Sequence, residues 1–168
     1  LAKTDIDRVA DAHRREVSAS LRLLAEKLYR RNPREWKKGG QPSAEAALAR
    51  LFDAWPPWRS PELGGKHGTE AVLLALREDY AGDRVAAFVA GLGGMLHDAF
   101  NSKHEFFVID DLDPQRLYNS ARNLEIAAWK LAQARGADGA PLLLSNEIAP
   151  VQNLSFEREF GKMIGNLD

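Results

Sequence analysis

The sequence predicts a single all-α domain over residues 1–168, an irregular bundle of five or six helices around a central Gly/Ala-rich helix at about residues 83–102. Three observations support this prediction. Apolar residues recur at helical spacing through most of the chain, and prolines, glycines and capping residues separate the periodic stretches. The β-like run at residues 105–109 is too isolated to form a sheet. A chain of 168 residues, 45% hydrophobic and 28% charged, is long enough to bury one core.

The central helix is predicted from two faces of different character. Large apolar side chains recur at helical spacing on one face: Val85, Phe88, Val89, Leu92, Leu96 and Phe100. Small residues gather on another face: Ala86, Ala90, Gly93 and Gly94. Each glycine lowers helix stability by about 1 kcal/mol relative to alanine, so a close neighbour is a natural reason to keep glycine there. We expect a neighbouring helix on this face, either within the chain or across a homodimer.

The helices of the first half are bounded by capping residues and prolines. Side chains suited to N-caps precede the first four helices: Thr4, Ser43, Thr69 and Asp83. Pro33 ends the first helix and Pro56 ends the second, because the residue before a proline is pushed out of the helical conformation. The expected ranges before the central helix are residues 5–31, 43–55 and 69–80, with one short turn over residues 34–38.

Two further helices are predicted in the second half of the chain. Pro114 occupies a first helical position and begins a long helix that ends at Arg135, where Gly136 supplies a C-terminal cap. The last helix is amphipathic and begins at about Ser155. The loop between these two helices carries an apolar run, residues 142–144, which we expect to be buried.

Charge and composition exclude several classes of function. The net charge of −1 argues against a general nucleic-acid binder, which needs an excess of Lys and Arg. The absence of cysteine excludes disulfides, thiol catalysis, zinc–thiolate sites and covalent c-type haem attachment. The longest apolar run, residues 85–96, is shorter than the roughly 20 residues that a membrane span needs.

The chain begins at Leu1 without an initiator methionine. One explanation is the removal of a secretory or lipoprotein signal, and the other is a trimmed chain. From the first explanation we expect an exported protein or lipoprotein in the periplasm or cell envelope. From the second, the protein is cytoplasmic.

Histidine spacing near the end of the central helix gives one candidate metal or haem site. His97, Asn101 and His104 fall at i, i+4 and i+7, on one face of a helix that extends so far. Together with a neighbouring carboxylate, Glu105 or Asp98, the two imidazoles suit zinc, copper or iron, and His13 is a candidate ligand from across the bundle. The Glu-x-x-His and His-Glu-x-x-His patterns are absent, however, so hydrogen-bonded histidines are the simpler interpretation. On balance no cofactor is expected.

Two other classes of function stay open. A small hydrolase, for example one that uses Glu105 and His97, lacks a Gly-x-Ser-x-Gly elbow. A binding domain needs an exposed apolar surface, and four aromatic residues are the candidates for it: Trp55, Trp58, Phe156 and Phe160. The alternative for the two tryptophans is packing over the helix ends. We expect a non-catalytic helical domain that binds a protein partner or a membrane surface and no nucleic acid.

Overall fold

In the computed structural model of the protein, the central helix predicted over residues 83–102 is present as α5 (Arg84–Asn101). Asp83 caps this helix as expected, because its Oδ1 accepts a hydrogen bond from the Ala86 N–H at 2.9 Å. The predicted apolar face is buried in the core: Val85, Phe88, Val89, Leu92, Leu96 and Phe100. The periodicity of the sequence therefore identifies the centre of the fold correctly.

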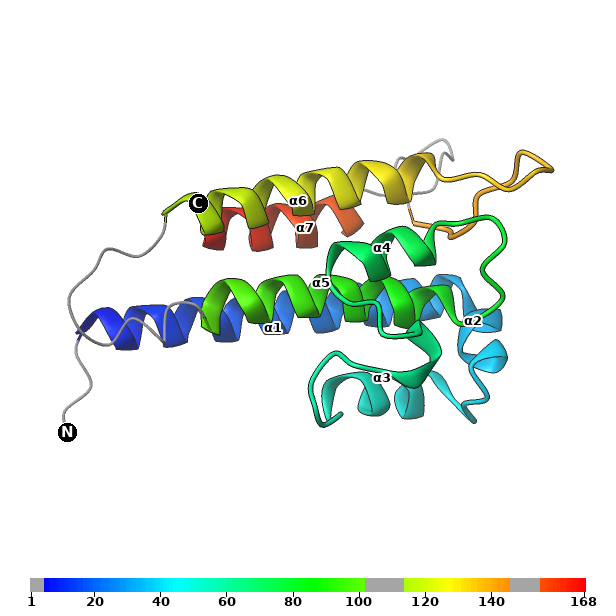
Figure 1. Ribbon diagram of the computed structural model, residues 1–168, viewed down its shortest axis with the longest axis horizontal. Coiled ribbons are helices and arrows are strands. Elements are labelled where there is room, and N and C mark those ends of the chain that lie inside the picture. Colours follow the sequence, from blue (N-terminus) through cyan, green and yellow to red (C-terminus); the bar gives the residue numbers. More distant parts are fainter. Residues whose placement is uncertain (1–4, 102–113, 146–154) are drawn as a thin grey trace.

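The structure describes residues 5–101, 114–145 and 155–168, and these ranges are helical without any β-strand (Figure 1). The predicted all-α fold is confirmed, with seven α-helices and one 3₁₀ turn in the described part of the chain. In order, these elements are α1 (Asp5–Arg31), α2 (Pro33–Lys38), α3 (Ala44–Phe52), η1 (Pro61–Leu63), α4 (Thr69–Ala75), α5 (Arg84–Asn101), α6 (Pro114–Gln133) and α7 (Ser155–Leu167). None of these helices is both long and apolar enough to cross a membrane.

Two layers of long helices form the body of the molecule (Figure 1). Helices α1 and α5 lie in one layer and α6 and α7 lie in the other, with α7 packed against both α1 and α6. Helix α4 packs on α5, while α2 and α3 contact α1 and α5 at one end of the molecule. The short elements therefore surround the C-terminal end of α1 and the first turns of α5.

Helix α2 takes the place of the single turn that the sequence predicted. Pro33 occupies its first position, where the missing N–H costs nothing. The side chain of Asn32 does not cap α2 but bonds the backbone of Leu144, accepting from its N–H at 2.8 Å and donating to its carbonyl at 2.9 Å. The apolar run at residues 142–144 is therefore held through the backbone of Leu144. Of these three residues, only Leu143 is fully buried. The expected burial of the whole run is wrong.

The glycines of α5 lie where other parts of the same chain approach its backbone. A Cβ on Gly91 would lie 2.7 Å from the Gly68 carbonyl oxygen and from the Val72 nitrogen, at the beginning of α4. A Cβ on Gly93 would overlap the indole ring of Trp58. The close neighbours expected on the small-residue face are therefore α4 and Trp58 of the same chain. A homodimer through this helix stays a prediction.

Candidate functional site

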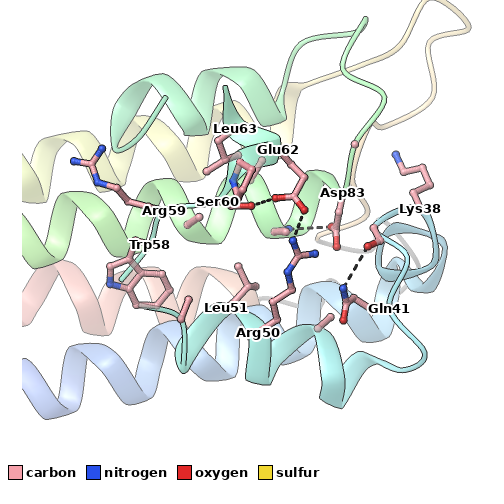
Figure 2. A pocket seen from close by; sticks show the side chains of 18 of the residues that line it. Lys38, Gln41, Arg50, Leu51, Trp58, Arg59, Ser60, Glu62, Leu63 and Asp83 are labelled. Carbon is pink, nitrogen blue, oxygen red and sulfur yellow. Dashed lines mark hydrogen bonds and ion pairs between the residues drawn. The ribbon is translucent and has the colours of Figure 1, made fainter. Parts of the chain in front are cut away.

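A cavity of about 230 Å³ lies at the end of the molecule where α1, α3 and α5 meet (Figure 2). Its walls come from these helices and from the segment at residues 58–63. Most of the wall is apolar, and its apolar members are Ala47, Leu51, Ala54, Trp58, Pro61, Leu63, Ala86, Ala87 and Ala90. Three of these are alanines of α5, so the small residues of this helix leave space open beside α3.

A buried, hydrogen-bonded pair, Tyr29 of α1 and Asp83, forms a polar part of the cavity wall. Tyr29 Oη donates to Asp83 Oδ2 at 2.8 Å, while Asp83 Oδ1 accepts from the Ala86 N–H. Burial, and after it the charge of Asp83, raises the pKa of Tyr29, so the phenol stays protonated and acts as a donor. Burial also raises the pKa of Asp83, although the hydrogen bonds from Ala86 and Tyr29 oppose this shift.

The raised pKa of Asp83 means that ionising this carboxyl opposes folding. A carboxyl with a higher pKa in the folded state contributes stability that is complete below its unfolded pKa. That contribution is lost as the pH rises through the folded pKa. Near neutral pH the carboxylate of Asp83 is therefore kept inside the fold at a cost in free energy of unfolding.

The mouth of the cavity is crossed by a network between α3 and η1 (Figure 2). Arg50 donates to Glu62 Oε1, and the hydroxyl of Ser60 donates to Glu62 Oε2. The hydrogen bonds from Ser60 and Arg50 lower the pKa of Glu62 to about 2. Glu62 is therefore ionised at neutral pH, and its charge is matched by the guanidinium of Arg50.

The other basic side chains beside the cavity are directed elsewhere. Lys38 Nζ lies 2.6 Å from Glu35 Oε2, and Glu35 is only 1% exposed. Arg59 points away from the cavity (Figure 2). Asp83, in contrast, has hydrogen bonds but no ion pair among the described residues. Among the charged side chains that line the cavity, Asp83 is therefore the one that neither forms an ion pair with a described residue nor points away.

The four predicted binding-surface residues do not form one surface. Trp55 is 90% exposed, beyond the end of α3, which stops at Phe52 rather than at Trp55 as expected. Trp58 is half-buried against α5, with its ring edge-on to Phe52 at 5.1 Å between centroids. Phe160 is buried and packs edge-on to Phe88. The side chain of Phe156 lies outside the described residues.

The predicted metal set, His97, His104 and Glu105, is described only at His97. His97 is exposed and lines a second cavity of about 250 Å³ together with Arg14 and Arg15 of α1, whose charges disfavour a bound cation. His104 and Glu105 lie outside the described residues. Within the described ranges, no three His, Cys, Asp or Glu side chains are grouped so that they could hold a metal ion. The metal site stays a prediction.

His13, the candidate ligand from across the bundle, is engaged with the C-terminal helix. Its Nδ1 lies 2.7 Å from Asn166 Oδ1 of α7. The contact joins the first and last helices of the described chain, which pack against each other over much of their length. A hydrogen-bonded histidine between helices, the simpler interpretation of such residues, accounts for this position.

The cavity gives the hydrolase alternative little support. The serine hydroxyl next to a carboxylate there belongs to Ser60, and its partner Glu62 has a pKa of about 2. A carboxylate held so far below neutrality is a poor general base. No histidine is among the described residues that line this cavity. The described lining therefore has no serine–histidine pair of the kind that nucleophilic hydrolysis uses.

Comparison of the chain with models of known protein families, with curated proteins and with solved structures finds no match. An all-helical fold hosts many unrelated activities and implies none of them. Function therefore has to be inferred from the chemistry of the cavity.

Proposed function

We propose that the protein is a non-catalytic domain that binds a small molecule in the cavity between α1, α3 and α5. The supporting observation is the combination of apolar walls with the buried Tyr29–Asp83 pair. Small-molecule sites are typically apolar clefts with a few well-placed polar groups. The volume of about 230 Å³ lies below the range of roughly 300–1,000 Å³ that is usual for drug-sized ligands, so the ligand is a small one.

A purely structural role for this region would favour a filled space. Protein interiors are packed as densely as organic crystals, and larger side chains on α5 would close the gap to α3. The chain instead has Ala86, Ala87 and Ala90 along this wall. It also keeps an ionisable carboxyl next to the gap, at a cost in stability. Both features favour a space kept open for a ligand.

Replacing Ala86 with leucine is expected to fill the cavity without breaking α5, because leucine is a good helix former. We expect the wild-type protein to retain a bound small molecule in native mass spectrometry after incubation with a small-molecule extract of its source cells. Ala86→Leu is expected to lose that added mass. Ala49→Leu is the matched control, since Ala49 is an exposed residue of α3 outside the cavity, and it should retain the ligand. No added mass on the wild type, or equal masses on wild type and Ala86→Leu, contradicts the proposal.

Association with a protein partner or a membrane surface through Trp55 is a second candidate function. Its support is the 90% exposure of this indole, because tryptophans often anchor interfaces. Trp55→Ala is expected to leave the free energy of unfolding within about 0.5 kcal/mol of wild type. The same change should abolish cosedimentation with phospholipid vesicles or with a copurifying partner. Trp129→Ala, at an exposed position of α6, is the control that should retain it. Export to the cell envelope stays a prediction.

A further inference from the structure

Asp83 carries more charge than its role at the start of α5 requires. As an N-cap it accepts the Ala86 N–H, a task that Asn or Ser performs as well as Asp. Either of those residues would avoid the cost of burying a carboxylate, which burial imposes on Asp83. The helix dipole also favours a negative charge at this position, but burial outweighs it, since the pKa of Asp83 is raised. The capping role therefore explains a polar side chain more fully than it explains a buried carboxylate.

The surroundings of Asp83 favour a cation as the missing partner. The guanidinium of Arg50 is paired with Glu62, and the ammonium of Lys38 lies against Glu35. The charge of Lys38 also lowers the pKa of Asp83, but burial raises that pKa by more, so Lys38 compensates the carboxylate only in part. A cationic ligand would supply the counter-charge that Asp83 lacks among the described residues.

Aromatic side chains around the cavity strengthen this preference. Tyr29, Trp58 and Tyr80 all contribute to its wall, and the faces of such rings attract cations. The alanines of α5, with Leu51 of α3, supply apolar surface for a hydrocarbon body. The wall as a whole therefore combines one carboxylate without an ion pair among the described residues, three aromatic rings and an apolar lining.

We infer that the ligand of this cavity is a small organic amine, bound through its ammonium group to the carboxylate of Asp83 and through its apolar body to the walls of α3 and α5. The inference rests on the proposed function, because it assigns a chemical class to the ligand of the same cavity. The amine displaces water from the apolar wall, and its N–H groups donate to a free lone pair of the Asp83 carboxylate.

Three monosubstituted benzenes of similar size test the sign of the ligand's charge. Benzylamine is a cation at neutral pH, benzyl alcohol is neutral and benzoate is an anion. We expect benzylamine to bind the wild-type protein about tenfold or more tightly than benzyl alcohol, and benzoate to bind most weakly, as measured by NMR titration. This comparison uses only the wild-type protein and does not depend on the folding of any variant.

Asp83→Asn assigns the effect to this carboxyl, because asparagine keeps the helix cap and removes the charge. The variant should bind benzylamine about tenfold or more weakly, at the affinity of benzyl alcohol, which should itself be unchanged. Asp79→Asn is the matched control, because Asp79 is an exposed carboxylate outside the cavity, and it should bind like wild type.

Equal binding of benzylamine and benzyl alcohol to wild type, or an Asp83→Asn variant that retains the preference, overturns the assignment of an amine but leaves the proposed function standing. Binding of none of the three compounds to wild type overturns both.

Discussion

Replacing Arg84 with alanine is expected to lower the free energy of unfolding by about 3 kcal/mol or more. Arg84 is the first residue of α5 and is only 7% exposed. Its guanidinium donates to the carbonyl oxygens of Ala75 at 2.8 Å, Arg77 at 2.5 Å and Glu78 at 3.0 Å, and so fixes the turn between α4 and α5. Removing it takes a donor from each of these acceptors, and each buried acceptor left without a partner costs about 1–3 kcal/mol.

Urea unfolding monitored by circular dichroism measures this loss. Arg77→Ala is the matched control, because Arg77 is an exposed arginine in the same turn whose side chain pairs with exposed Asp79. It is expected to change the free energy of unfolding by no more than about 0.5 kcal/mol. Arg84→Lys should fall between the two, since a lysine keeps the charge but not the planar fork of donors. A loss for Arg84→Ala as small as that for Arg77→Ala would show that the three hydrogen bonds do not hold the turn.

Replacing Gly91 with alanine is expected to lower the free energy of unfolding by about 2 kcal/mol. The new Cβ would lie 2.7 Å from two backbone atoms of the α4 start, the Gly68 oxygen and the Val72 nitrogen. Backbone cannot yield as the end of a flexible side chain can, so α4 must move away from α5. The higher helix propensity of alanine, worth about 1 kcal/mol, offsets only part of this cost.

Replacing Gly161 with alanine is expected to raise the free energy of unfolding instead. Gly161 also lies within a helix, α7, but a Cβ there meets no atom within 4 Å. Only the propensity gain remains, so the variant should be more stable by up to about 1 kcal/mol. Thermal unfolding of both variants tests the close approach of α4 to α5. That approach predicts a loss of stability for Gly91→Ala and a gain for Gly161→Ala. Stabilisation by Gly91→Ala would mean that α4 does not pack closely against this glycine.

The sequence predicts which residues are buried better than it predicts what those residues pack against. The apolar periodicity of α5 and the cap at Asp83 depend on local spacing and local hydrogen bonding, and both are visible in the chain. The apolar face of α7 is visible too, but periodicity cannot say what covers it. Phe160 was a candidate for a binding surface, whereas the structure packs it against Phe88 in the core. An amphipathic pattern identifies a face to be buried, not the surface that buries it.

The candidate cavity could not be predicted for a related reason. Tyr29 and Asp83 are 54 residues apart and meet only because the end of α1 lies beside the start of α5. Arg50 and Glu62 likewise meet across the gap between α3 and η1. The available signals were a tyrosine beside the apolar face of the first helix and alanines on α5 that leave room. Neither signal indicates a cavity until the helices are packed.

The most direct test of the central claim, that the cavity is a binding site, is to map where a small apolar probe binds. We would titrate the ¹⁵N-labelled protein with benzyl alcohol and follow the amide signals. Binding in the cavity predicts that the changes concentrate on Ala86, Ala87 and Ala90 of α5 and extend to Leu51 of α3. Changes centred instead on the second cavity, which His97 lines, or no saturable change at any residue, would contradict the claim.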